Sequence, residues 1–281
     1  MGKLRETNFR NRLKLTFIMS LIVCIMLPQT VFAKKSNLAE PVVDGDMTIE
    51  EGAEEYIQTE EDLIEDMEIV IEKLEKLDID ATVIKEELKA RKENNKNGIA
   101  TRAVTITKSE AELFSTVKPV NIKFGITAFK QTNDYYCGPA TVKQVINFNT
   151  GTSKSQAFYA GKLGTTTAGT DMTKIAGVLN TYQSRTTYKY LSFTSQLMWR
   201  NRVAMNTPSG IPTVMDISSK ATNWLYETNG HFLNTAGFDC RTSPETVWIC
   251  DPHPVYHGVH KSTVNAAFTV NNAHFRKAII W

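Results

Sequence analysis

The chain has 281 residues, of which 42% are hydrophobic, and its formal net charge is +2. This length and composition exclude a disordered or fibrous protein and are typical of one globular domain with additional segments. The charge is divided unevenly: +4 over residues 1–33, −11 over residues 34–100 and +9 over residues 101–281. The positive charge of the last part is spread out, and no glycine-rich phosphate loop accompanies it. The sequence therefore argues against nucleic-acid binding.

Residues 1–33 have the pattern of a secretory signal peptide. Five basic residues are followed by a mostly apolar run over residues 15–27, and Val31 and Ala33 lie where signal peptidase requires small residues. A membrane-spanning helix needs about 20 apolar residues, so this run is too short to be a stable anchor. We expect a secreted, extracellular protein, either free or associated with the cell surface, with no membrane span after signal cleavage.

Residues 34–117 form an acidic part. Residues 34–50 resemble an extended linker. Apolar residues spaced by three and four over residues 60–93 predict an amphipathic helix with an acidic outer face, and the weaker pattern at residues 78–82 allows two shorter helices as well as one long one. The acidic part is then either a spacer or a pro-segment that docks on the positive domain by charge attraction.

Residues 118–281 have the composition of a globular domain. Period-two and period-three-to-four patterns predict a strand at 120–129, helices at 137–148, 154–163, 171–179 and 195–205, and a buried strand at 211–217. Two further strand-like runs, NGHFLNTAGFD and VWICDP, are separated by the loop CRTSPE and predict a β-hairpin.

The run QTNDYYCGPATVKQVINF places one cysteine, Cys137, on the first turn of the helix it predicts. Pro139 suits an early helical position because it has no N–H to leave unpaired. The positive end of a helix dipole favours a thiolate, which a cysteine nucleophile requires. Gln131 has an amide that can donate to an oxyanion beside the sulfur. The alternative is a buried structural cysteine.

His231 begins the first run of the hairpin and Asp251 ends the second, so both lie toward its open end. A symmetric loop leaves Asp251 a few residues short of His231, so close approach requires a bulge or an uneven loop. If the two meet, the carboxylate can accept the imidazole Nδ1–H and orient the ring. Taken singly, each has an ordinary structural explanation, but together with Cys137 and Gln131 they favour a catalytic site.

Other candidate sites are weaker. His253, His257 and His260 fit no common zinc spacing, so no metal is expected, and no cofactor motif is present. In a hairpin centred near residues 243–244, Cys240 and Cys250 are about three residues out of register, so a disulfide requires a different register.

The order Gln…Cys-Gly-Pro-Ala, then Gly-His-Phe, then Asp-Pro resembles the double-glycine leader peptidases, cysteine peptidase family 39, and more closely their exported stand-alone relatives. The resemblance covers roughly residues 118–281. It implies an α+β, papain-like fold, in which a helical side carrying the cysteine packs on an antiparallel sheet carrying the histidine and aspartate. The runs KSTVNAAF and KAIIW fit its closing helix and strand.

The resemblance also implies a thiol peptidase, with Cys137 as nucleophile, His231 as general base and then acid, Asp251 as orienter and Gln131 as oxyanion donor. We expect hydrolysis of a peptide or protein substrate through a thioester; a transferase or amidase on the same fold, or a catalytically silent binding module, are the alternatives. Asn234 and Thr235 stand where relatives tend to be apolar, which predicts a wetter strand. The membrane spans and ATPase of the transporter-linked members are not found, so a transporter-delivered substrate is not implied.

Overall fold

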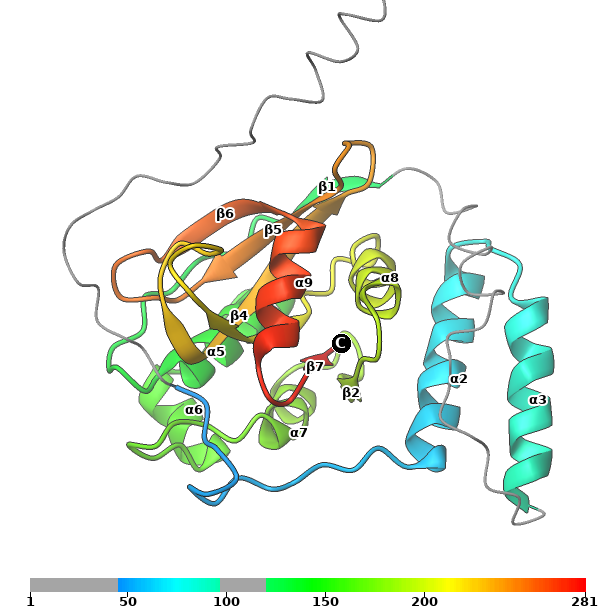
Figure 1. The fold of residues 1–281 in the computed structure, drawn as a ribbon, viewed down its shortest axis with the longest axis horizontal. Coiled ribbons are helices and arrows are strands. Elements are labelled where there is room, and N and C mark those ends of the chain that lie inside the picture. Colours follow the sequence, from blue (N-terminus) through cyan, green and yellow to red (C-terminus); the bar gives the residue numbers. More distant parts are fainter. Residues whose placement is uncertain (1–44, 97–119) are drawn as a thin grey trace, which may run out of the picture. The chain divides into compact units, whose positions relative to one another are not determined.

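The computed structural model describes residues 45–96 and 120–281 (Figure 1). The predicted signal peptide, the linker up to residue 44 and the end of the acidic part lie outside the described residues. No helix within the two described ranges is long and apolar enough to cross a membrane.

The described residues of the acidic part form α2 (Glu60–Lys76) and α3 (Thr82–Lys96). The helices of the following region are α5 (Cys137–Thr150), α6 (Gln156–Leu163), α7 (Thr173–Tyr182), α8 (Gln196–Asn206) and α9 (Val264–Ala273). Its strands are β1 (Asn121–Lys123), β2 (Tyr190–Ser192), β3 (Val214–Ser219), β4 (Thr228–Asp239), β5 (Thr246–Asp251), β6 (Gly258–Thr263) and β7 (Ala278–Ile280).

The strands form one antiparallel sheet in the order β2-β7-β3-β4-β5-β6, and β1 pairs with β4. Side chains alternate between the two faces of each strand, so both faces can bury apolar residues. Val214 and Phe232 pack against α5, α6 and α7, whereas Met215 and Leu233 pack against α8 and α9. The sheet is therefore covered by helices on both faces, with α9 and α5 on opposite sides (Figure 1).

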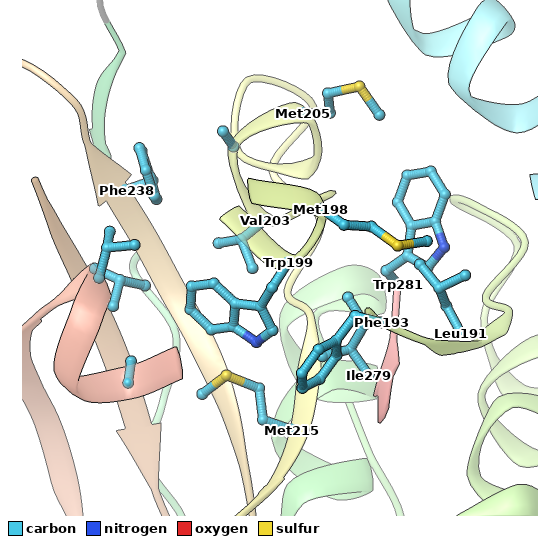
Figure 2. Packing of buried hydrophobic residues seen from close by; sticks show 14 of the residues in the cluster. Leu191, Phe193, Met198, Trp199, Val203, Met205, Met215, Phe238, Ile279 and Trp281 are labelled. Atoms are coloured by element: carbon cyan, nitrogen blue, oxygen red, sulfur yellow. The ribbon is translucent and has the colours of Figure 1, made fainter. Parts of the chain in front are cut away.

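The core on the α8 side is centred on two tryptophans (Figure 2). Trp199 of α8 is fully buried, and its indole N–H donates to Asn271 Oδ1 at 2.8 Å, which fixes α8 against α9. Trp281, the last residue, lies beside Met198 and Leu191 in the same cluster (Figure 2). A buried tryptophan N–H usually finds such a partner, so the Asn271 contact makes the packing of Trp199 specific.

Over residues 60–96 the acidic part forms two helices instead of one. Thr59 caps α2 through a capping box with Asp62. The helix ends at Lys76, Leu77 is its C-cap, and Asp78 adopts a left-handed conformation. Val70 and Leu74 of α2 are fully buried and belong to the same cluster as Trp281. The apolar face predicted for this helix therefore packs on the core of the following region.

Most predicted elements are confirmed, with three differences. The strand expected over residues 120–129 is a strand only at Asn121–Lys123. The short strands β2 and β6 were not predicted from the sequence. The helical side carrying the cysteine packs on an antiparallel sheet carrying the histidine and aspartate, so the predicted α+β, papain-like fold class is confirmed.

Candidate active site

Cys137 is the first residue of α5 and is fully buried. No side chain of the described residues caps this end of the helix, so the positive end of its dipole lies beside the cysteine backbone. A Cβ at Gly138 would lie 2.5 Å from Thr170 Oγ1, which explains why glycine follows the cysteine. The loop ending at Thr170 thus packs directly on the first turn of the helix.

Two side-chain contacts hold α5 on β4, the strand that carries the histidine. Thr141 Oγ1 donates to the carbonyl oxygen of Phe232 at 3.0 Å, and Gln144 Nε2 donates to Asn234 Oδ1 at 2.9 Å. Both donors and Asn234 are fully buried, as is most of β4. The expectation that Asn234 and Thr235 mark a wetter strand is therefore wrong, because these polar side chains are buried and bonded within the fold.

His231 and Asp251 meet in the interior. His231 Nε2 lies 2.9 Å from Asp251 Oδ1, and both side chains are buried. The nitrogen that faces the carboxylate is therefore Nε2 and not Nδ1 as expected. Nδ1 is buried and has no hydrogen-bond partner in the described structure. A neutral imidazole that donates from Nε2 has a lone pair at Nδ1, so this nitrogen is free to accept a proton.

A β-bulge brings these two side chains to one face. The pairing of β4 with β5 skips one residue of β4 next to Gly237. A shift of one residue moves side chains to the opposite face of a strand. With the bulge Asp251 shares a face with His231; without it Asp251 would share a face with Asn234. Gly237 has φ +135°, and a Cβ there would lie 2.1 Å from the Ile122 carbonyl oxygen, so only glycine fits.

Asp251 accepts two further hydrogen bonds. The Tyr226 hydroxyl donates to Oδ2 at 2.6 Å, and the backbone N–H of His253 donates to Oδ1 at 2.8 Å. Burial alone would raise the pKa of Asp251, but the charge and hydrogen bond of His231, together with the bonds from Tyr226 and His253, hold it below its usual value. Tyr226 thus adds to the effect of His231 in keeping the carboxylate ionised, a role that its sequence context did not reveal.

The aromatic stack beside Asp251 includes His253, whose ring stacks on Tyr226 at 4.0 Å between centroids. Its Nδ1 accepts from the N–H groups of Val255 and Tyr256. Burial lowers the pKa of His253 to about 4, so the ring is neutral at physiological pH. His253 is a structural residue of the turn after β5 in this arrangement.

Gln131 connects the cysteine loop to the strand that bears Asp251. Its backbone N–H donates to the carbonyl oxygen of Pro252 at 2.8 Å, and its side-chain Nε2 donates to the carbonyl oxygens of Asn133 and Asp134, each at 2.9 Å. Both hydrogens of the amide are therefore used inside the loop before α5. In this state of the protein Gln131 holds the shape of the loop.

The extended segment after the linker covers the cysteine; we call residues 45–54 the strap. Gly45 donates its N–H to the carbonyl oxygen of Gly230 at 2.7 Å and accepts the N–H of Thr170 at 2.9 Å. Met47 donates to the Thr170 carbonyl oxygen at 3.1 Å. A Cβ at Gly45 would lie 2.0 Å from Cys137 Sγ. The main chain of the strap therefore runs between Gly230, which precedes His231, and Thr170, directly over the sulfur.

Arg276 holds the strap from the other side. Its guanidinium lies 3.4 Å from Asp46 Oδ2 and 3.0 Å from Asp171 Oδ1, and it also donates to the carbonyl oxygens of Met47 and Glu54. Neither Arg276 nor Asp46 was a sequence candidate. A recognisable signal existed only for Asp216, a lone carboxylate inside the apolar run of β3, which lies close to Asp46 in the structure.

The covered thiol has a raised pKa. Burial is the main cause, and the nearby carboxyl groups of Asp216 and Asp46 add to it, whereas hydrogen bonds with the Phe232 and Gly138 backbone lower it. In this state, desolvation under the strap opposes the thiolate that the helix dipole favours.

The other cysteines of the described region, Cys240 and Cys250, are free thiols. Cys240 lies at the β1 end of the sheet, where its sulfur accepts the N–H of Val120 at 3.0 Å. Cys250 is buried on β5 and pairs in register with Asn234.

Comparison with known proteins places this arrangement in a family. No curated protein matches the sequence. Among solved structures, the peptidase domain of Streptococcus ComA, a bi-functional ABC transporter involved in a quorum sensing pathway, is 16% identical, covers 54% of this chain and 93% of its own, and has a TM-score of 0.38. A double glycine motif protease from an AMS/PCAT transporter, solved with a leader peptide, is 14% identical over 58% of this chain and 94% of its own, with a TM-score of 0.40.

The family profile gives the assignment. The profile of the Peptidase C39 like family matches residues 123–277, which begins within β1 and ends just before β7. This range contains Cys137, His231 and Asp251 and amounts to more than half of the chain. The protein therefore belongs to the Peptidase C39 like family.

Proposed function

We propose that this protein is an exported cysteine peptidase that hydrolyses peptide bonds through Cys137, His231 and Asp251. The observation that carries the proposal is the buried pair of His231 Nε2 and Asp251 Oδ1, which leaves His231 Nδ1 without a partner among the described residues. His231 lies on β4 next to Phe232, whose backbone hydrogen-bonds Cys137. A general base needs a nitrogen whose lone pair no other group uses, which is the case here within residues 45–96 and 120–281.

In the proposed reaction, His231 Nδ1 takes the proton of the Cys137 thiol, and the sulfur attacks the carbonyl carbon of the substrate. The C–N bond then breaks, the amine leaves with the proton held by His231, and a thioester remains on the sulfur. Water attacks this thioester with His231 as base and releases the acid. Asp251 keeps the ring oriented and stabilises the imidazolium that forms.

The oxyanion of the tetrahedral intermediate would lie at the N-terminus of α5, where the Cys137 backbone N–H and the helix dipole can stabilise it. The Gln131 amide is the proposed second donor, which requires that it exchange one of its two loop bonds for the oxyanion. Loss of one such donor typically lowers turnover by ~10²–10³.

We further propose that the acidic part is a pro-segment that keeps the peptidase inactive during export, since the strap fills the groove over Cys137. The carbonyl oxygen of Gly45 is bonded to the Thr170 N–H and not to the donors at the N-terminus of α5. A carbonyl held this way is not activated for attack, so the strap acts as an inhibitor and not as a substrate. Helix α2 adds a buried ion pair, Asp66 with Arg202 at 2.7 Å.

The test uses the full chain with Gly45→Ala, a change that displaces the strap. In this background we expect hydrolysis of a mixed peptide library and iodoacetamide labelling of Cys137. The further change Cys137→Ala should abolish both together, and the control Cys240→Ala should leave both in place. Hydrolysis that survives Cys137→Ala would contradict the proposed nucleophile.

A further inference from the structure

The side chain of Asp46 enters a buried polar cluster next to the cysteine. Asp46 Oδ2 lies 3.3 Å from His274 Nε2 and 3.4 Å from Arg276 Nε. Oxygens of Asp46 and Asp216 and a nitrogen of His274 all lie within 4.8 Å of one another, and all three residues are buried. Asp46 belongs to the strap, whereas the other members belong to the groove. The cluster therefore forms only when the strap is docked.

The carboxyl groups of Asp46 and Asp216 lie close together in this cluster with too few hydrogen-bond donors around them. Within the described residues, Asp46 Oδ1 and both carboxylate oxygens of Asp216 have no hydrogen bond. His274 Nδ1 lies 3.5 Å from Asp216 Oδ2, but it accepts the backbone N–H of Arg276 and so has no proton to donate. Two buried carboxylates side by side repel each other and lose their hydration. One proton between them removes a charge and provides the missing hydrogen bond. We call Asp46 and Asp216 the carboxyl pair.

The proton resides on the carboxyl pair itself, because the neighbouring His274 ring does not carry it. Burial, together with the charge of Arg276, lowers the pKa of His274 to about 3, so that ring is neutral. Burial raises the pKa of Asp46 to about 6 and that of Asp216 well above its usual value. The charged and titratable groups that face the pair from the surrounding elements are Arg276, His274, Asp171, Tyr190 and Cys137.

We propose that a single proton shared by Asp46 and Asp216 holds the strap in the groove, and that its loss to solvent as the pH rises releases the strap and uncovers Cys137. The inference rests on the proposed function, of which it specifies the regulation. Once the strap has left, Asp46 is an ordinary aspartate in water and Asp216 is left with Arg276 and His274. The proton is therefore needed only in the docked state.

The direction of the pH dependence follows from this difference. The pKa of Asp46 rises from its ordinary value of 3.8 to about 6 on docking, so the docked state binds the additional proton. Docking is therefore strongest below pH 3.8 and weakens as the pH rises through about 6. Each proton released changes the docking equilibrium by up to roughly tenfold per pH unit.

Amide hydrogen exchange measures docking directly. The amides of Gly45 and Met47 donate to groove carbonyls, so their protection factors report how often the strap opens. The protein is the full chain with Cys137→Ser, which prevents self-cleavage, and exchange is measured from pH 5 to pH 8 and corrected for intrinsic rates. We expect protection to fall by tenfold or more between these limits, and a chelator at constant pH to have no effect.

Two variants separate the carboxyl pair from general charge effects. In Asp46→Asn the amide donates permanently to Asp216, so protection should stay high at all pH values. In the control Glu50→Gln an exposed carboxylate of the strap is neutralised, and the pH dependence should remain.

Three results would overturn the inference. Protection that is high and independent of pH in the parent chain, or an equal fall in Asp46→Asn, would show that the carboxyl pair does not control docking. Opening by a chelator would show that a cation, and not a proton, joins the pair. Peptide hydrolysis by the Gly45→Ala chain is measured separately, so failure of the proposed peptidase activity is distinguished from failure of this inference.

Discussion

Adding one methyl group at Gly45 should release the strap from Cys137. In Gly45→Ala the new Cβ would lie 2.0 Å from Cys137 Sγ, whereas ordinary contacts begin at 3.4 Å. We expect the strap to move away from the buried thiol by about 1.4 Å, which lengthens the bonds of Gly45 to Gly230 and Thr170, now 2.7 and 2.9 Å, beyond hydrogen-bond reach. Two lost hydrogen bonds at about 0.5–1.5 kcal/mol each make opening roughly 5- to 150-fold more favourable.

The assay is the rate of iodoacetamide labelling of Cys137 in the folded full chain at one pH, with thermal unfolding recorded alongside. We expect labelling of Gly45→Ala to be faster by a factor in this range, because thiol access requires strap opening. The matched control is Gly161→Ala in α6, where an added Cβ meets nothing within 4 Å. If both variants label at the parental rate, the strap does not cover the thiol and the reasoning is refuted.

Three further changes test the site and its cover. Tyr226→Phe removes a hydrogen bond that lowers the pKa of Asp251, so this pKa should rise. The acid limb of the pH profile of kcat/KM should then move to higher pH. An unchanged profile would contradict the role of the hydroxyl. Gly237→Ala breaks the β-bulge, and we expect loss of turnover with a lower melting temperature, so full activity would show that the bulge does not orient Asp251. Asp66→Ala breaks the buried ion pair between α2 and Arg202, and breaking such a pair costs about 3–5 kcal/mol, so iodoacetamide labelling of Cys137 should accelerate. The control Glu65→Ala breaks an exposed ion pair and should change the labelling rate less. Equal effects of the two changes would refute the reasoning.

Local sequence patterns predict much of the domain. The helix that begins at Cys137 follows from Pro139 and the apolar spacing after it, and the hairpin follows from two strand-like runs around a polar loop. The acidic helices also follow from periodicity, including the break between them. Each of these depends on neighbouring residues, which the sequence displays directly.

The geometry within the site could be predicted only in part. The approach of Asp251 to His231 depends on one extra residue beside Gly237. A glycine within a strand does not by itself indicate a bulge, so the sequence could not predict this approach. Which imidazole nitrogen meets the carboxylate depends on side-chain rotamers. The pKa of the Cys137 thiol depends on its burial, which the residues next to it in the sequence do not indicate.

The strap was not visible in the sequence because its partners are far away along the chain. Gly45 bonds to Thr170 and Gly230, and Asp46 meets Arg276. The sequence showed only an extended, acidic stretch, which is also what a free linker looks like. Charge asymmetry suggested a pro-segment but did not identify which residues would lie over Cys137.

The most direct measurement of the proposed chemistry is the intact mass of the Gly45→Ala chain during turnover of a peptide ester. The account predicts an added acyl mass on the peptide that contains Cys137, which decays as product forms and does not appear with Cys137→Ala. With His231→Ala the adduct should form far more slowly, because the thiol has lost its base. Turnover without any adduct on Cys137, at an equal rate in Cys137→Ala, would contradict the thioester mechanism.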